Sequence, residues 1–235
     1  MDVKILSKDK IYTSISSRIA NLVNSKSNAI LGLATGGTAL GVYEQLVKDY
    51  KAGKLSFKNV KTFNLDEYLP IEPTNPQSYR FYMNHNLFNN IDIDLNNTFF
   101  PSLDNYQQYD ELIAKQNGID LQILGLGSNG HIAFNEPGTD FNSLTHIVQL
   151  AQSTIKDNSR FFDSIDLVPK QAITMGLKSI MNTKEIILIA TGKNKAPAIK
   201  KLMEEEPNEQ LPVSILKNHP NVTIYLDEEA ASLLC

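Results

Sequence analysis

The segment Leu121–Pro137 gathers residue types that can move protons, directly after an apolar run. The run ends at a glycine, and Asn129, His131 and Glu136 follow it closely. Histidine titrates near neutral pH without help, so its ring can both accept and release a proton. A lone histidine in a turn is more often a surface residue. Here the crowding of polar groups after an apolar strand favours a proton-transfer site, with Asn129 and Glu136 orienting the ring.

A carboxylate follows a second predicted strand, Val60–Leu65. Acidic residues at a strand end are often solvated turn residues or helix caps. In a parallel sheet, however, the carboxyl ends of strands from distant parts of the chain meet along one edge. Asp66 comes directly after the strand, so we favour it over Glu67 as an acid–base group in the same cleft as His131.

A glycine turn joins the predicted strand Ala29–Leu33 to a helical pattern. The turn consists of Thr35, Gly36, Gly37 and Thr38. Free N–H groups at such a helix start, with threonine hydroxyls beside them, can hold an anion. The glycine spacing is neither that of a Walker loop nor that of a dinucleotide fingerprint. The turn alone is weak support for a site, because many strand-to-helix turns bind nothing.

Cations for that anion come from later in the chain. Glu185–Ala190 reads as a buried strand, and Lys195 lies near the start of the helix that follows its glycine turn. Arg160 lies in Ser153–Pro169, which fits either a mobile helical lid or an ordinary surface helix. The sequence therefore predicts an anion seat, a carboxylate and a histidine at one edge of a sheet.

Strands alternate with helical patterns along the whole chain, which predicts an α/β fold. We expect a three-layer, Rossmann-like architecture, in which a mostly parallel open sheet carries helices on both faces. Val222–Leu226 reads as the last strand and Asp227–Leu234 as a short terminal helix. Without a repeat or a composition break, residues 1–235 are expected to form a single domain.

Composition excludes several classes of function. The net charge of -4 and the pI of about 5.6 argue against a nucleic-acid partner. With neither a signal peptide nor an apolar run of membrane-spanning length, we expect a cytoplasmic protein without a membrane partner. The single cysteine, Cys235, rules out a disulfide within the chain and a thiolate metal site, and we expect it to be a frayed bystander. The residues show no spacing for metal ligands.

Five motifs together resemble the glucosamine-6-phosphate deaminase (glucosamine-6-phosphate isomerase) family. They are GSNGHIAFNEPGT, FNLDEYL, LATGGTALGVYEQL, DNSRFFD and NKAPAI. The likeness covers nearly the whole chain, and the GHIAFNEP string is highly specific. The resemblance implies conversion of glucosamine 6-phosphate and water to fructose 6-phosphate and ammonia in amino-sugar catabolism. It implies a sugar phosphate as the small-molecule partner, and neither a cofactor nor a metal.

The resemblance also assigns roles to residues. His131 would transfer the proton of ring opening, with Glu136 and Asn129 supporting it. Asp66 would remove the proton from C2 and return one to C1. A lid around residues 150–170 would close over the substrate. The phosphate site carries over to Thr35, Gly36, Gly37, Thr38, Arg160 and Lys195.

This chain departs from the family pattern at two places. Some members carry an aspartate where this chain has Asn129, which can donate a hydrogen bond but holds no negative charge. The chain also ends soon after its last strand, whereas the hexameric, allosterically regulated members continue. We therefore expect a monomer or small homo-oligomer without activation by N-acetylglucosamine 6-phosphate.

Two other functions fit parts of this pattern. A 6-phosphogluconolactonase would share the broad fold, the glycine loop and a Gly-His pair. Glu136 would have no duty in simple lactone hydrolysis. A sugar-phosphate sensor that regulates transcription would need a DNA-reading element, and the chain has neither spare length nor a basic helix for one.

Overall fold

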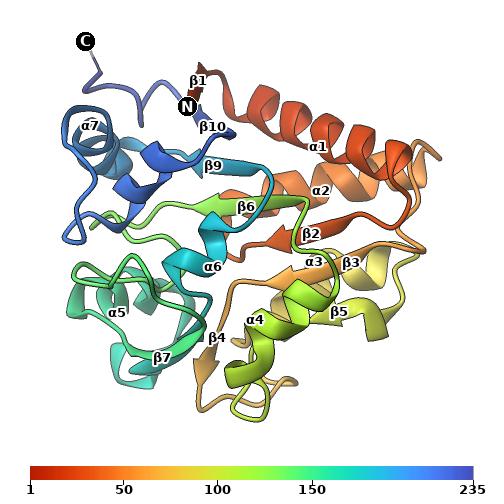
Figure 1. Ribbon diagram of the computed structural model, residues 1–235, viewed down its shortest axis with the longest axis horizontal. Helices are drawn as coiled ribbons and strands as arrows, with labels where there is room; N and C mark the ends of the chain where they lie inside the picture. Colours follow the sequence, from red (N-terminus) through yellow and green to blue (C-terminus); the bar gives the residue numbers. More distant parts are fainter. Residues whose placement is uncertain (235) are drawn as a thin grey trace.

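A parallel seven-stranded sheet forms the centre of the molecule. The computed structural model describes residues 1–234, and Cys235 lies outside the described residues. Figure 1 shows the strands stacked from one edge to the other. In that order they are β1 (Asp2–Ile5), β10 (Val222–Leu226), β9 (Ile186–Ala190), β6 (Leu121–Gly125), β2 (Ile30–Leu33), β3 (Lys61–Asn64) and β5 (Thr98–Phe99).

The strand order reverses beside β2. From β2 the chain runs outward to β3 and β5, and it then returns to place β6 on the other side of β2. Open α/β sheets bind ligands at the carboxyl ends of strands beside such a switch point, because loops that diverge there leave a crevice. The crevice expected here lies between the loops that follow β2 and β6.

Helices bury apolar faces against this sheet. In α1 the residues Ile11, Ile15 and Ile19 recur at one-turn spacing and are fully buried. Every residue of β2 and β9 is buried, which explains their continuous apolar runs. The α-helices are α1 (Lys8–Ser25), α2 (Gly37–Lys51), α3 (Tyr79–Asn86), α4 (Tyr106–Lys115), α5 (Gln152–Asn158), α6 (Leu177–Met181) and α7 (Ala196–Glu204).

Short 3-10 helices join these elements. They are η1 (Phe88–Asn90), η2 (Leu95–Asn97), η3 (Ser159–Phe161), η4 (Ile165–Leu167), η5 (Lys193–Lys195) and η6 (Pro212–Asn218). None of the helices within residues 1–234 is long and apolar enough to cross a membrane.

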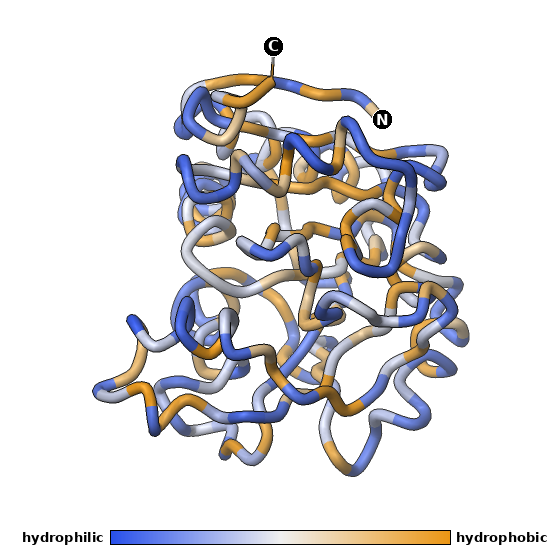
Figure 2. The backbone as a smooth tube through the Cα atoms, turned by 90° about the vertical axis from the view of Figure 1, so that its left-hand side faces the viewer, coloured by the Kyte–Doolittle hydropathy of each residue, from blue (hydrophilic) through white to orange (hydrophobic). Residues whose placement is uncertain are grey.

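A second, antiparallel sheet lies beyond the carboxyl end of β3. It has the order β4 (Asp66–Leu69), β8 (Gln171–Thr174) and β7 (His146–Gln149). Asp66 pairs with Thr174 at its start. The sheet packs a small core of its own, made of Tyr68, Phe134, Leu150, Ile155, Val168 and Ala172. Figure 2 shows both chain termini at one end of the molecule, and Figure 1 shows β4 and β7 toward the opposite end.

The predicted α/β architecture, with a mostly parallel sheet flanked by helices, is confirmed. Two details differ from the sequence-based prediction. The antiparallel sheet was not anticipated, because β4 continues β3 after a bend at Leu65. The predicted helix at Asp227–Leu234 was wrong, and the segment forms successive turns. The Asp227 side chain accepts the N–H of Ala230 at 2.8 Å, as a helix cap does, but the bonds that follow from Ser232 and Leu234 close three-residue turns in place of a continuous α-helical series.

Candidate active site

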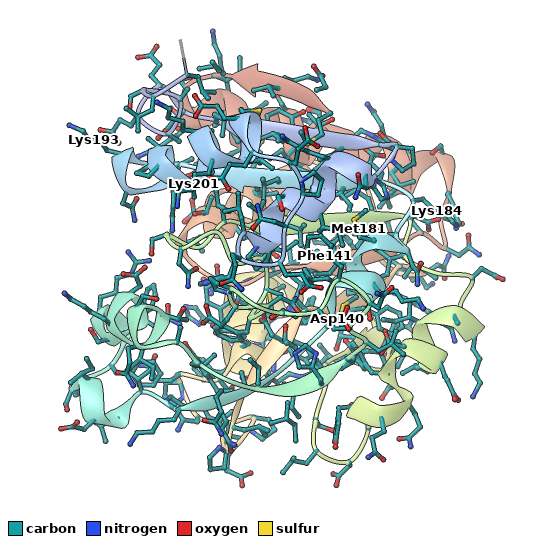
Figure 3. The ribbon with its side chains drawn as sticks, turned by 60° about the vertical axis from the view of Figure 1, so that its left-hand side comes forward. Asp140, Phe141, Met181, Lys184, Lys193 and Lys201 are labelled. Carbon is teal, nitrogen blue, oxygen red and sulfur yellow. The ribbon has the colours of Figure 1, made fainter. Side chains whose placement is uncertain are left out.

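A cavity of about 320 Å³ opens at the carboxyl ends of β2, β3, β6 and β9. Lys184 precedes β9 and Lys193 follows it, and Figure 3 shows these two lysines on opposite sides of the molecule. Helix α5 lies on the same side as Lys193. Eight of the ten predicted site residues line the cavity. They are Thr35, Gly36, Gly37, Thr38, Asp66, His131, Arg160 and Lys195.

The other two predicted residues, Asn129 and Glu136, lie behind His131. The His131 Nδ1 atom is 3.4 Å from Glu136 Oε2 and 3.3 Å from the Thr154 hydroxyl. Asn129 Nδ2 donates to Glu136 Oε2 at 2.8 Å, and Asn129 Oδ1 accepts the His131 backbone N–H at 3.2 Å. The imidazole is therefore held on one edge by a carboxylate that is itself held in place.

Glu136 remains ionised to low pH. Burial raises the pKa of its carboxyl, but hydrogen bonds and charge from His131, with Thr154 and Asn129, outweigh burial and lower that pKa to about 2. Its other oxygen accepts the backbone N–H of Ala151 at 3.2 Å. The charged Glu136 carboxylate thus lies 3.4 Å from the His131 Nδ1 atom and is fixed there by its other hydrogen bonds.

Asp66 and Glu67 adjoin in the chain, but their carboxylates have different surroundings. Glu67 accepts backbone N–H groups from Tyr68, Tyr79 and Arg80 at 2.9–3.0 Å, and so it holds the start of α3. Asp66 is 6% exposed and lines the cavity. Burial, with the charge of Glu67, raises the pKa of Asp66 well above its usual range. A desolvated carboxylate of this kind is suited to act as a base.

The loop after β6 needs particular residues to bring His131 to the cavity. A Cβ atom added to Gly127 would lie 2.4 Å from the His131 ring, so only glycine allows this approach. Ala133, in the cavity wall, adopts a left-handed φ of +52°. Asn135 is buried and donates to the carbonyl groups of Ile132 and Met175 at 3.1 and 2.8 Å. These bonds join the loop to the end of β8.

The predicted anion seat lies at the start of α2. Gly36 has a φ of +102°, a conformation that side chains disfavour, and its carbonyl oxygen accepts the Tyr82 hydroxyl at 2.9 Å. Arg160 from η3 and Lys195 from η5 line the cavity with this turn. Burial lowers the pKa of Lys195, Asp157 raises it and Arg160 lowers it. Two cations and a helix start together can hold a phosphate group.

The predicted lid comprises α5, η3 and η4, and it packs on the second sheet. Asn158 Nδ2 donates to the Tyr68 hydroxyl at 2.8 Å, which joins the lid to the strand that begins at Asp66. The ring of Phe162 meets Tyr68 edge-on at 5.8 Å between centroids. The predicted lid thus carries Arg160 and contacts β4, the strand that begins at Asp66.

A family assignment follows from comparison with known proteins. The family model for glucosamine-6-phosphate isomerases/6-phosphogluconolactonase matches residues 7–225. The chain belongs to this family. It is 51% identical over 230 residues to a glucosamine-6-phosphate deaminase of Mycoplasma mycoides subsp. mycoides SC, covering 97% of this chain and 94% of the relative. It is 50% identical to one of Clostridium novyi, covering 99% and 100%.

Solved structures agree with this assignment. A monomeric glucosamine-6-phosphate deaminase described as a missing link of the NagB superfamily has a TM-score of 0.97 and 42% identity, covering 99% of this chain and all of that one. A 6-phosphogluconolactonase from Leishmania guyanensis has a TM-score of 0.79 at 20% identity, covering 100% of this chain and 98% of that one. The second likeness shows a shared fold alone. The resemblance stated from the motifs is confirmed.

Sequence reasoning missed several residues of this family site. Thr154 contacts His131 from the predicted lid but lies outside the five motifs, and Asp157 lines the cavity but was given no role although it opens the DNSRFFD motif. Gly127 was noticed only as the end of an apolar run. Its closeness to a histidine four residues later was the signal that could have revealed its steric role. Within residues 1–234, no group of three or more His, Cys, Asp or Glu side chains is arranged to hold a metal ion.

Proposed function

We propose that this chain is a glucosamine-6-phosphate deaminase that converts glucosamine 6-phosphate and water to fructose 6-phosphate and ammonia. The observation that carries the proposal is that a buried carboxylate and an oriented histidine share one cavity with a glycine turn and two cationic side chains. The family membership and the deaminase relatives at about half identity support it.

Substrate binding begins at the phosphate. The turn Thr35–Thr38, with Arg160 and Lys195, would hold the phosphate oxygens, and lid closure would exclude water. Holding the phosphate at one end of the cavity places the sugar carbons toward Asp66 and His131. Removing water strengthens each electrostatic interaction with the sugar.

His131 would then open the sugar ring. Its imidazole transfers the proton between the C1 hydroxyl and the ring oxygen, so that C1 becomes an aldehyde. Glu136 stabilises the ring while it is protonated, and Asn129 fixes Glu136. General acid–base groups in hydrogen-bond reach contribute roughly 10²- to 10⁴-fold each to the rate.

Asp66 would carry out the isomerisation. Its carboxylate removes the C2 proton, the electron pair of that bond forms a C1–C2 double bond, and the π pair of the C1 aldehyde moves to its oxygen, which takes up a proton. The nitrogen lone pair then forms a C2–N double bond while the C1–C2 π pair takes up a proton at C1. The amino group at C2 becomes an imine, which water hydrolyses to the ketone with release of ammonia. The raised pKa of Asp66 favours proton abstraction, because a more basic carboxylate holds the proton better.

We further propose that residues 1–235 act as a single domain and a monomer. Both sheets contribute to one cavity wall, through the loops of the central sheet and through Asp66 and Tyr68 of β4. The relative of known structure at 42% identity is described as monomeric.

The proposed activity is tested by measuring ammonia and fructose 6-phosphate from glucosamine 6-phosphate. We expect equal amounts of the two products from the native protein, and rates lower by about 10²-fold or more in His131→Ala and Asp66→Asn. Asp163→Asn, an exposed lid residue outside the cavity, is the matched control and should keep full activity. Hydrolysis of 6-phosphogluconolactone without ammonia release, or undiminished release by Asp66→Asn, would refute the proposal.

A further inference from the structure

Asp157 is a second carboxylate in the cavity wall, and the mechanism above does not use it. Among the described residues that line the cavity, only Asp66 and Asp157 carry carboxylates. Asp157 belongs to the last turn of α5, on the lid, and it is exposed. It lines the same cavity as Arg160 and Lys195, and a negative charge there opposes an incoming phosphate rather than holding it.

The position of the Asp157 carboxylate is defined by a neighbour from another element. The Ser128 hydroxyl, in the loop after β6, donates to Asp157 Oδ2 at 2.5 Å. Among residues 1–234, no lysine or arginine nitrogen lies within ion-pair distance of this carboxylate. The charge of Asp157 is therefore not neutralised by a direct partner, although it opposes the lowering of the Lys195 pKa that burial causes.

We propose that Asp157 sets the anion affinity of the phosphate seat, by repelling the phosphate group that Arg160 and Lys195 attract. The inference rests on the proposed function, because that function places a phosphate in this seat. A phosphate group carries up to two negative charges, so one carboxylate nearby weakens its binding appreciably. The hydrogen bond from Ser128 restrains the position of the carboxylate.

A rival role for Asp157 is a purely structural one, in which its bond to Ser128 ties the lid to the β6 loop. The two roles predict different effects for Asp157→Asn. The asparagine oxygen can still accept the Ser128 hydroxyl, so the tie remains while the charge is lost. Asp157→Ala loses both the tie and the charge. Asp163→Asn removes one negative charge from the same lid outside the cavity, and it is the matched control.

The experiment is a titration of the ¹⁵N-labelled protein with inorganic phosphate, followed through the amide signals of Gly36 and Gly37. We expect Asp157→Asn to bind phosphate about 3- to 10-fold more tightly than the native protein at low salt. The difference should shrink toward unity at 0.5 M salt, about where the screening length falls to a few ångströms. Asp163→Asn should match the native protein, and the KM for glucosamine 6-phosphate should fall in Asp157→Asn by a similar factor.

Each other outcome overturns the inference. Unchanged or weaker phosphate binding in Asp157→Asn would mean that Asp157 acts only by joining the lid to the β6 loop. A loss of phosphate affinity in Asp157→Ala alone would mean the same. An equal gain in Asp163→Asn would mean a general charge effect, and no phosphate-induced shift in any variant would mean that the seat binds no phosphate. Because the titration needs no turnover, it remains decisive even where deaminase activity fails.

Discussion

Asp66 lies in the cavity where we propose that it acts as a base, and its burial makes the charged carboxylate unfavourable for the stability of the fold. Its carboxylate is buried, and burial is the main cause of its raised pKa. A group whose pKa is higher in the folded than in the unfolded state stabilises the fold below the unfolded pKa. This stabilisation is lost as the pH rises through the folded pKa. Glu136 has the opposite linkage, because its lowered pKa, about 2, stabilises the fold above the usual glutamate range.

We therefore predict that Asp66→Asn stabilises the protein at high pH while abolishing turnover. The asparagine cannot ionise, so the variant avoids the cost of a buried charge at high pH. The difference in free energy of unfolding, variant minus native, should therefore be about 1–2 kcal/mol larger at pH 8 than at pH 4. Urea unfolding at the two pH values measures this difference. If the difference in free energy of unfolding between variant and native protein does not change with pH, ionisation of the Asp66 carboxyl carries no cost in the folded protein.

At the scale of elements, the end of β10 holds the turn after β9. Both oxygens of Asp227 lie 3.0 Å from the backbone nitrogen of Gly192, and Oδ1 also accepts the N–H of Ala230. The turn leads through η5 to Lys195, whose N–H bonds the Gly192 carbonyl at 3.0 Å. Asp227 is 5% exposed, so these N–H groups would lack a partner without it.

We predict that Asp227→Ala raises the KM for glucosamine 6-phosphate about 10-fold, because losing a buried acceptor costs on the order of 1–3 kcal/mol and displaces Lys195. Asp227→Asn keeps one acceptor oxygen and should give a smaller rise. Steady-state kinetics measure both. A fall in kcat with an unchanged KM would show that Asp227 acts on the chemical step and not on the phosphate seat.

Elements were predicted with unequal success. The strands β2, β9 and β10 lie within about a residue of the predicted apolar runs, since buried strands in a parallel sheet are continuously apolar. The lid segment 153–169 left a choice between lid and surface helix. Its role depends on contacts such as Asn158 with Tyr68, which join residues distant in the sequence.

At the scale of the whole molecule, the cavity couples the two sheets. Its wall includes Leu65, where the chain leaves the central sheet, and Asp66, where it enters the second. The second sheet has a small core of its own. The chain enters it from β3 of the central sheet and returns from β8 through α6 to β9. Such a part gains most of its stability from its neighbour.

We predict that the chain unfolds in a single cooperative transition as a monomer of 26.2 kDa. Circular dichroism and calorimetry should give the same midpoint, and inorganic phosphate should raise that midpoint, since it binds only the folded state. Light scattering measures the mass. An earlier, separate transition would show that the second sheet unfolds independently, and a larger mass would contradict the monomer.

Local features of the chain determined the order of elements, the glycine turns and the identity of the residues at strand ends. These follow from periodicity and backbone preferences, which act between near neighbours in the sequence. The tertiary structure alone decided that Asp66 is desolvated, that Glu136 carries a charge beside His131, and that Asp157 lines the same cavity as Arg160 and Lys195. A pKa, a hydrogen bond and a Coulomb interaction depend on distances between groups far apart along the chain, and only the folded chain sets those distances.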